Sequence, residues 1–171
     1  MSGPVVVLVG PMGAGKSTVA ELLGTVWGLP VRDTDRDVEA AEGRSIADIF
    51  VDSGEEQFRA LERAAVAEAL AAHRGVLALG GGAVLDPATR EALAGQPVVF
   101  LRVGLSDAVK RVGLTSGRPL LFGNVRARIK TLLDERTPIY ESVARFSVDT
   151  DGRTPQEVAD EVSVLIERAR P

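Results

Sequence analysis

The 171-residue chain contains no cysteine, one histidine and few aromatic residues, and each shortage excludes a class of function. Because the chain has no cysteine, it cannot form disulfides, thiolate metal sites or cysteine nucleophiles. With one histidine, His73, a histidine-based zinc site or catalytic triad is close to excluded, and the place of His73 near an expected helix end predicts a solvated terminal residue. Aromatic residues make up 4% of the chain, which leaves little surface for stacking on nucleic acid bases.

Long apolar runs and a surplus of positive charge are also missing. No stretch approaches the ~18 apolar residues of a membrane span, and Met1 is not followed by a basic and then apolar signal segment. The net charge of −4 differs from the basic face that nucleic-acid-binding domains usually carry. We therefore expect a cytoplasmic protein with no membrane and no nucleic-acid partner. The length suits a single domain, residues 1–171, and no large apolar face is indicated, so a monomer is expected.

A glycine-rich loop follows the first apolar run of the sequence. Residues 10–17 read GPMGAGKS, in which Gly10, Gly15, Lys16 and Ser17 match the pattern G-x-x-x-x-G-K-[ST]. In this pattern the backbone N–H groups surround phosphate oxygens, and glycine lets the ligand approach the backbone closely. An ordinary glycine-rich turn is the alternative. The strand pattern before the loop and the helical pattern after it favour the binding of a nucleoside triphosphate.

The residues after this loop have the apolar spacing of a helix over 19–27. Phosphate would therefore lie at a helix N-terminus, where unpaired N–H groups and the helix dipole favour an anion. Lys16 is expected to reach the β- and γ-phosphates as a catalytic residue, and the Ser17 hydroxyl to hold Mg²⁺. The nucleotide-binding residues of the loop are expected to be Gly13, Ala14, Gly15, Lys16, Ser17 and Thr18.

Short apolar runs alternate with helical patterns along the chain. Strands are expected over residues 5–9, 30–31, 76–79, 98–101 and 146–148. Helices are expected over residues 16–27, 36–42, 46–52, 56–72, 87–94, 106–112, 124–142 and 155–169. Fully apolar strands that alternate with helices indicate an α/β fold, with a parallel sheet covered on both faces. Ligands bind such sheets beyond the carboxyl ends of the strands, which brings the glycine-rich loop, residues 33–35 and residues 80–82 to one edge.

The sequence Asp33-Thr34-Asp35 follows the short second strand. Alternation along a strand predicts that both carboxylates lie on the same side. Two carboxylates beside a triphosphate require a cation between them, so we expect Asp33 to be the acidic Mg²⁺ ligand beside Ser17. Asp35 would then orient or deprotonate an acceptor hydroxyl. An acidic turn that only improves solubility is the alternative.

The third strand runs into three glycines, residues 80–82, where many phosphate-loop proteins carry an acidic Mg²⁺ ligand. Glycine at this position lets a ligand lie against the backbone. Its presence supports Asp33 as the acidic partner of the metal. Together with the lack of an Asn-Lys-x-Asp guanine motif, it argues against a switch GTPase.

Only three of the 20 basic residues are lysine, so most arginines are expected to be ordinary surface cations. Arg59, one turn before Glu62, and Arg136, at an expected helix break beside a proline, are candidates for bidentate binding of a substrate carboxylate. Arg118 lies in the segment SGRPLLFGN and is a candidate lid arginine over the transferred phosphoryl group. Arg111 ends the helix before that lid. A solvated surface role is the alternative for each.

The motifs GPMGAGKST, DTD, GRSIADIF, GEEQFRALE, LALGGGAV, RPLL and RTPIY occur in the order found in shikimate kinases, and the chain resembles that family from Val5 to about Pro155. The resemblance implies a nucleoside-monophosphate-kinase-like P-loop fold. This fold is a three-layer α/β/α sandwich with a five-stranded parallel sheet, a substrate-binding helical region and a lid. The implied activity is transfer of the γ-phosphoryl group of ATP to the 3-hydroxyl of shikimate, with Mg²⁺, in chorismate and aromatic amino acid synthesis.

The resemblance also implies roles for the residues that match its motifs. Asp35 would hold the shikimate hydroxyls and serve as the base. Arg59 and Arg136 would bind the substrate carboxylate, with Gly81 and Gly82 contacting it through their backbone.

The nucleotide side of the site follows from the same resemblance. Arg118 would be the lid arginine near the phosphates, and Arg111 would sandwich the adenine with the region of Arg153 and Pro155. The implied core covers residues 4–34, 75–112 and 124–171, the substrate-binding region about 35–63 and the lid about 113–124.

Two other functions fit part of this pattern. A gluconate kinase would share the phosphate loop and an acidic motif after the second strand, but is not expected to carry the GGG loop and RTPIY together. An ATP-binding regulatory module without catalytic activity would not need the full set of candidate catalytic and metal-binding residues that the sequence carries: Lys16, Ser17, Asp33, Asp35 and Arg118. We therefore expect an ATP-dependent shikimate kinase.

Overall fold

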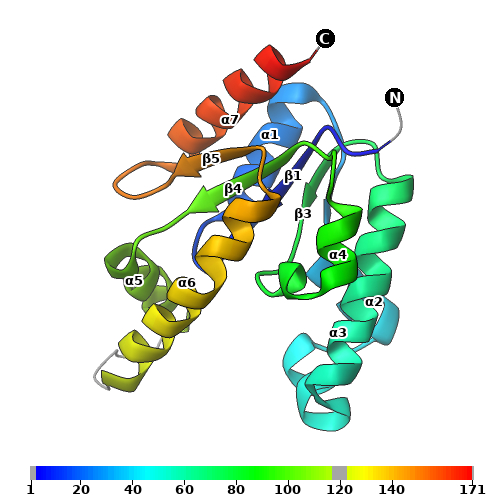
Figure 1. Ribbon diagram of the computed structural model, residues 1–171, viewed down its shortest axis with the longest axis vertical. Coiled ribbons are helices and arrows are strands. Elements are labelled where there is room, and N and C mark those ends of the chain that lie inside the picture. The colour runs from blue at the N-terminus through cyan, green and yellow to red at the C-terminus, as the bar shows by residue number, and fades with distance from the viewer. Residues whose placement is uncertain (1–2, 117–122, 171) are drawn as a thin grey trace.

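The computed structural model describes the backbone of residues 3–116 and 123–170, and the side chains of residues 3–112 and 125–170 (Figure 1). Within these residues, five parallel strands form one sheet in the order β2-β3-β1-β4-β5. The strands are β1 (Val6–Val9), β2 (Val31–Asp33), β3 (Val76–Ala78), β4 (Val98–Arg102) and β5 (Phe146–Asp149). The predicted parallel α/β fold is confirmed.

Helices connect successive strands and pack on both faces of the sheet (Figure 1). They are α1 (Lys16–Trp27), α2 (Thr34–Glu42), α3 (Ile46–Ala72), the 3-10 turn η1 (Ala83–Leu85), α4 (Pro87–Ala92), α5 (Leu105–Ser116), α6 (Gly123–Val143) and α7 (Pro155–Ala169). None of the helices formed by the described residues is long and apolar enough to cross a membrane.

Strand β1 shows why the strands of this sheet are apolar on both sides. Val6 and Leu8 pack with α1 and α7 in one cluster of buried side chains, while Val7 and Val9 pack with α3, α6 and Leu93 in another. All four residues are fully or almost fully buried. Each face of the sheet therefore has its own core, as the unbroken apolar runs predict.

Helix α3 contains the two helices that the sequence predicts over residues 46–52 and 56–72. The backbone at Gly54 is not helical, with φ of 85° and ψ of 167°, so the two segments meet at a kink. His73 follows the last turn of α3, and its Nε2 lies 2.9 Å from the carbonyl oxygen of Val76. The histidine is therefore half-buried and hydrogen-bonded, and the expectation of a solvated residue is wrong in this respect.

The expected helix break beside Arg136 is also wrong, because α6 continues through Pro138 to Val143. A proline inside a helix removes one backbone hydrogen bond and crowds the preceding turn. The buried side chain of Tyr140 packs this last part of the helix against the sheet. Tertiary packing therefore maintains the helix past the proline, and Arg136 keeps its place on a regular helical face.

A third and smaller apolar cluster lies outside the two core clusters. It is formed by Val38 of α2 and by Ile49 and Phe58 of α3. The rings of Phe50 and Phe58 lie 4.9 Å apart within this region. Residues 38–58 therefore have a packing unit of their own beside the sheet.

Candidate active site

The loop between β1 and α1 leaves the start of α1 open. Among the described residues, no side chain caps the N-terminus of α1 at Gly15. In contrast, four other helices begin with a side-chain oxygen that accepts a backbone hydrogen bond; these caps are Asp33, Ser45, Asp86 and Thr154. The first N–H groups of a helix need a partner, and an anion supplies one. The open start of α1 is therefore the phosphate-binding geometry that the sequence predicts.

Backbone geometry explains the glycines of this loop. Gly15 has φ of 86°, a conformation that other residues rarely adopt. A methyl group at Gly10 would lie 2.7 Å from the carbonyl oxygen of Leu101 in the neighbouring strand. Ala14 lies between these glycines but anchors the loop. Its methyl group is buried in the core, and its N–H donates to the Pro11 carbonyl at 3.1 Å.

Lys16 folds its side chain back over this loop. Its Nζ donates to the carbonyl oxygens of Gly10 at 2.6 Å and Pro11 at 3.0 Å. Burial lowers the pKa of Lys16 to about 8, although the nearby carboxylates of Asp35 and Asp33 oppose that shift. The ammonium group is thus held within the phosphate loop by two backbone carbonyls.

The lowered pKa predicts that nucleotide affinity depends on pH. Phosphate binding favours the charged form of Lys16. At any pH where Lys16 is neutral in the free protein, nucleotide binding must therefore take up a proton. We expect the affinity for ATP to be constant from pH 7 to about 8 and to fall by up to about tenfold per pH unit above that. Calorimetric titrations between pH 7 and 9.5 measure this, with Lys16→Ala as the control that loses the pH dependence. Equal wild-type affinities at pH 7 and 9.5 would contradict it.

The acidic pair after β2 is brought together by a helix start. Asp33 ends β2 and caps α2, its Oδ1 accepting from the N–H of Asp35 at 2.9 Å. The alternation argument is therefore wrong for Asp35, because the chain has already turned into α2 at Thr34. The two carboxylates are close all the same. Burial raises the pKa of Asp35, the charge of Asp33 raises it further, and Lys16 opposes both effects.

The residues predicted to hold Mg²⁺ lie beside each other. Ser17 Oγ donates to Asp33 Oδ2 at 3.1 Å. Both are oxygen ligands of the kind that Mg²⁺ prefers, and Mg²⁺ commonly uses one or two protein ligands together with phosphate and water. Within the described residues there is no group of three or more histidine, cysteine or acidic side chains that would form a site by itself. The donor set therefore fits a cation that is shared with a nucleotide.

The glycine loop after β3 touches three parts of the site. A methyl group at Gly80 would overlap the Asp35 carboxylate, and one at Gly82 would overlap the Arg59 guanidinium. The Cα of Gly81 faces the phosphate loop, where a methyl group would lie 3.5 Å from the backbone nitrogen of Met12. Gly80 and Gly82 must therefore lack side chains for Asp35 and Arg59 to keep these positions, whereas a methyl group at Gly81 would only touch the phosphate loop.

Arg59 and Arg136 come from different helices to this region. The guanidinium of Arg59 is paired at 2.9 Å with Glu62, which is almost completely buried one turn along α3. Burial raises the pKa of Glu62, and the bond from Arg59 opposes that rise. The charge of Arg136 acts on the pKa values of Glu62 and Lys16, so Arg136 lies near the Arg59–Glu62 pair and the phosphate loop. The predicted pairing of Arg59 with Glu62 is confirmed.

On the other side of the phosphate loop, Arg111 and Thr150 join α5 to the loop after β5. Arg111 Nη1 donates to the carbonyl of Gly13 at 2.8 Å and to Thr150 Oγ1 at 3.1 Å. Its Nη2 donates to the Thr150 carbonyl at 3.1 Å. Thr150 is buried and donates in turn to the Arg102 carbonyl at 2.7 Å. The arginine is thus fixed at the outer edge of the phosphate loop.

The second predicted adenine contact lies in the same loop. The Arg153 N–H donates to the Thr150 carbonyl at 3.3 Å, and Pro155 is the first residue of α7. The Arg153 guanidinium donates to the carbonyls of Asp149 at 2.8 Å and Glu157 at 3.2 Å. Arg111 and Arg153 therefore both bond to Thr150, which brings together two of the residues that the sequence assigns to adenine binding.

Comparison with known proteins identifies the family of this site. A family model for shikimate kinase matches residues 12–167. A shikimate kinase from Salinispora arenicola is 59% identical over 163 residues, 95% of this chain and 98% of that protein. One from Streptomyces coelicolor is 58% identical over 158 residues, 92% of each. The solved structure of a shikimate kinase from Acinetobacter baumannii in complex with shikimate aligns with a TM-score of 0.90 and 32% identity, covering 99% of this chain and 96% of that one.

The chain belongs to the shikimate kinase family. It is an ATP-dependent kinase that phosphorylates shikimate, a step in chorismate and aromatic amino acid synthesis, as its motifs predict. The alternatives of a gluconate kinase and of a module without chemistry are not supported. Of the residues assigned by sequence, Arg118 lies outside the described part of the chain.

Three side chains of this shikimate kinase were not predicted from the sequence as parts of the site. The buried Thr34 hydroxyl accepts from the N–H of Gly80 at 3.3 Å, and the Tyr140 hydroxyl donates to the carbonyl of Gly81 at 2.5 Å. Thr150 holds Arg111, as described above. Thr34 and Tyr140 lie within the DTD and RTPIY motifs, and Thr150 lies in no motif, but an uncharged side chain gives no signal of its own, so only the contacts in the folded chain reveal these roles.

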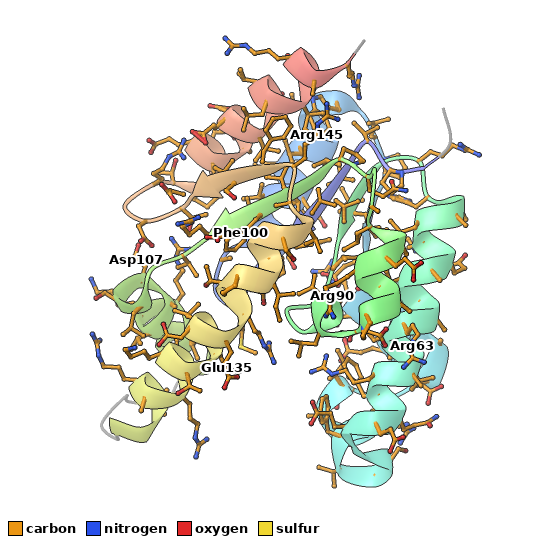
Figure 2. The ribbon with its side chains drawn as sticks, in the orientation of Figure 1. Arg63, Arg90, Phe100, Asp107, Glu135 and Arg145 are labelled. Atoms are coloured by element: carbon orange, nitrogen blue, oxygen red, sulfur yellow. The ribbon has the colours of Figure 1, made fainter. Side chains whose placement is uncertain are left out.

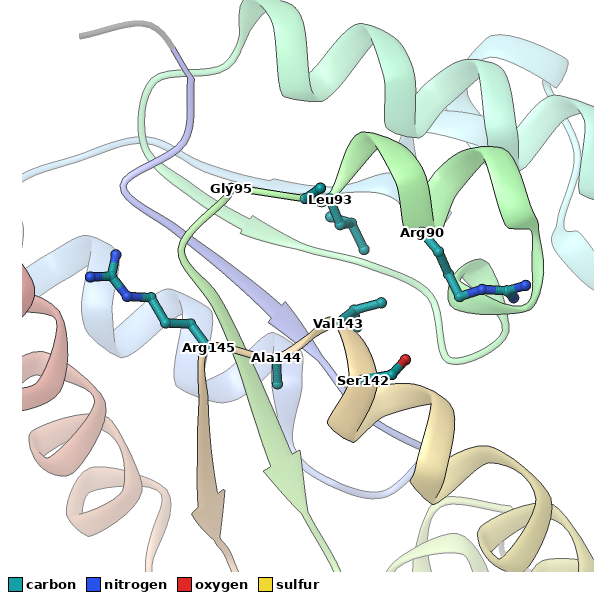
Figure 3. Close-up of a pocket in the computed structure, with 8 residues that line it drawn as sticks. Arg90, Leu93, Gly95, Ser142, Val143, Ala144 and Arg145 are labelled. Atoms are coloured by element: carbon teal, nitrogen blue, oxygen red, sulfur yellow. The ribbon is translucent and has the colours of Figure 1, made fainter.

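A cavity of about 410 Å³ lies at the opposite edge of the sheet, away from this kinase site (Figure 3). It is lined by residues that precede β4 and β5, among them Leu93, Gly95 and Ala144. The side chains of Arg90 and Arg145 extend away from each other rather than toward a shared point (Figure 3). The cavity therefore offers no converging charged groups for shikimate or nucleotide.

Proposed function

We propose that phosphoryl transfer from ATP to the 3-hydroxyl of shikimate takes place between the phosphate loop and the glycine loop of residues 80–82. The observation that supports this placement is the contact of the glycine loop with three groups at once: Asp35, Arg59 and the phosphate loop. A substrate bound against the loop would have a base, a carboxylate partner and a phosphate donor around it.

In this arrangement Asp35 accepts the proton of the 3-hydroxyl. The hydroxyl oxygen then forms a bond to the γ-phosphorus while the bond from that phosphorus to the bridging oxygen of ADP breaks, and ADP leaves with the electron pair. The raised pKa of Asp35 suits a group that must take up a proton. Lys16 would offset the negative charge on the β- and γ-phosphates, and Arg118 would close over them from the lid.

Ser17 and Asp33 are proposed to hold Mg²⁺ when nucleotide is bound. The ion would neutralise part of the phosphate charge, and the hydrogen bond between the two residues supports this pairing. Gly13, Gly15 and Thr18 would complete the phosphate site through their backbone. The hydrogen-bonded frame of Arg111 and Thr150, together with residues 153–155, supports adenine binding at the outer edge of the loop.

We propose the same division of the chain that the motifs imply: a core of residues 4–34, 75–112 and 124–171, a substrate-binding region of about 35–63 and a lid of about 113–124. The separate apolar cluster of α2 and α3 supports the substrate-binding region as a unit of its own.

We further propose a cytoplasmic monomer, since ATP is available in the cytoplasm. Its exposed large apolar residues lie on different elements, and its acidic net charge does not favour nucleic acid.

The experiment that tests the proposed function is a coupled assay of ADP release with ATP and Mg²⁺. Shikimate, gluconate and no acceptor are compared at equal concentrations, and the product is identified as shikimate 3-phosphate by its phosphorus coupling. ADP release that requires shikimate is expected. Release with gluconate at an equal rate, or phosphate on another hydroxyl, would contradict the proposal.

The carboxylate clamp predicts a selective loss of shikimate affinity. We expect Arg59→Ala and Arg136→Ala each to weaken shikimate binding about 10- to 150-fold, the equivalent of losing a charged hydrogen bond of about 1.5–3 kcal/mol. Arg→Lys should recover only part of this, because an ammonium group cannot form a bidentate pair. Titrations with shikimate and, separately, with nucleotide measure both affinities.

A matched control for the clamp is Arg63→Ala, one turn further along α3. Its guanidinium is paired with Asp86 at 2.5 Å and is half exposed, so its removal should leave shikimate affinity unchanged. If the Arg59 and Arg136 variants bind shikimate normally, or lose nucleotide to the same extent, the clamp is contradicted.

A further inference from the structure

Tyr140 lies where α6 meets the glycine loop, and none of the roles above uses it. Its side chain is fully buried, and its ring stacks with centroids 5.1 Å apart on Phe100 of β4, the strand residue labelled in Figure 2. Phenylalanine would fill such a position equally well if only apolar bulk were needed. The hydroxyl instead donates to the carbonyl oxygen of Gly81 at 2.5 Å. A buried tyrosine hydroxyl with one specific partner indicates that this carbonyl has to be held.

The carbonyl of Gly81 controls the orientation of a whole peptide group. In a planar trans peptide the Gly81 carbonyl and the Gly82 N–H point in opposite directions. With the carbonyl held by Tyr140, the peptide presents its N–H on the other side. Glycine on both sides of the peptide makes rotation easy, and a rotated peptide would present a carbonyl that repels a carboxylate.

The glycine loop has N–H groups to offer. In the described part of the chain, neither the Gly81 N–H nor the Gly82 N–H donates to a protein group, whereas Gly80 N–H is bound by Thr34. Gly82 is buried, and buried N–H groups nearly always have a partner. A ligand oxygen against the loop would supply the partner that the protein does not.

The surroundings of the Tyr140 hydroxyl connect it to the acceptor-binding arginines. Arg136 precedes Tyr140 by four residues on α6, so the two side chains share one face of the helix. Burial raises the pKa of Tyr140, while the charges of Arg136 and Arg59 oppose that rise and the charge of Glu62 adds to it. The hydroxyl is therefore placed among the groups of the proposed carboxylate clamp.

We infer that Tyr140 is a positioning residue for shikimate: its hydroxyl fixes the Gly81–Gly82 peptide and docks the face of α6 that carries Arg136. The inference rests on the proposed placement of shikimate between these arginines and the glycine loop. Tyr140 itself does not touch the reacting atoms. It acts on acceptor binding and leaves the nucleotide side of the site unchanged.

Tyr140→Phe is the direct test, because it removes one oxygen and keeps the buried ring. We expect the KM for shikimate to rise about 5- to 20-fold through the loss of the hydrogen bond and the unpaired carbonyl that it leaves. The KM for ATP should stay within twofold, and kcat at saturating shikimate within about threefold. Val162→Ala is the matched control, since it opens the core on the other face of the sheet. It should lower the melting temperature without changing either KM.

Tyr140 is the only tyrosine of the chain, which allows a second test without a mutation. Biosynthetic 3-fluorotyrosine would label this one site, and its fluorine NMR resonance should shift when shikimate is added, with half of the change near the shikimate KM. ADP alone should leave the resonance unchanged. This measurement still decides the inference if Tyr140→Phe does not fold.

The results separate the inference from the proposed site. An unchanged shikimate KM in folded Tyr140→Phe, or a resonance that does not respond to shikimate, overturns the positioning role. If Arg59→Ala raises the shikimate KM in the same assay, the proposed site stands without Tyr140. If Arg59→Ala also leaves the KM unchanged, the placement of shikimate itself is wrong. Equal rises in the shikimate and ATP KM values of Tyr140→Phe would indicate a general structural defect and would also overturn the inference.

Discussion

Lys16→Ala is expected to lower kcat about 10²–10³-fold, the usual cost of removing one charge that stabilises the transferring group. The wild-type ammonium lies within the phosphate loop, held by the carbonyls of Gly10 and Pro11. In the proposed site, its loss would remove the ammonium group that offsets the negative charge developing on the phosphates. The fold should remain intact, because these two bonds belong to the loop alone. Steady-state rates with saturating ATP and shikimate, together with a thermal melt, measure both expectations.

Lys130→Ala is the matched control for this variant. Lys130 is an exposed lysine on α6 that pairs with Asp134 at 2.5 Å within the same helix, so its removal should leave kcat unchanged. A Lys16→Ala protein that keeps more than a third of the wild-type turnover would disprove the assignment of the phosphate loop.

The sequence predicts the strands and helices of this chain well, because the sheet is buried on both faces. Strands such as β1 are uniformly apolar, and the glycine and acidic residues that follow them mark the carboxyl edge where ligands bind. Some helices begin at a residue whose side chain caps them, as α3 does at Ser45. The phosphate loop is marked in the sequence by its glycines. Glycine has no side chain that could cap α1, so the start of this helix stays open.

The parts that sequence reasoning missed depend on contacts between distant segments. The alternation rule failed at Asp35 because Asp33 caps a helix that begins at Thr34, two residues before the expected start at residue 36. The expected break at Pro138 failed because packing of Tyr140 outweighs one missing helix bond. Tyr140 also reaches Gly81, which is 59 residues away in the chain. No local spacing encodes such a pair.

Asp35→Asn is expected to lower the rate of phosphoryl transfer about 10²–10⁴-fold, the usual contribution of a positioned acid or base. The amide keeps the size of the side chain beside Gly80 but cannot accept the proton of the acceptor hydroxyl. The N–H of residue 35 still caps onto Asp33, so α2 should form as before. ATP affinity should change little or rise slightly, because a negative charge near the phosphates is removed. Single-turnover phosphoryl transfer and a nucleotide titration measure the two quantities.

Two controls define what this result means. Asp37→Asn removes the same charge from the same helix, where Asp37 pairs with Arg32 at 2.6 Å, and it should leave the transfer rate near the wild-type value. Asp33→Asn keeps a residue type that caps helices well, yet it should raise the Mg²⁺ concentration needed for half-maximal activity, because Asp33 lies with Ser17. If Asp33→Asn and Asp35→Asn gave identical Mg²⁺ titrations and identical residual rates, the separate roles of Asp35 as the base and Asp33 as the metal ligand would be wrong.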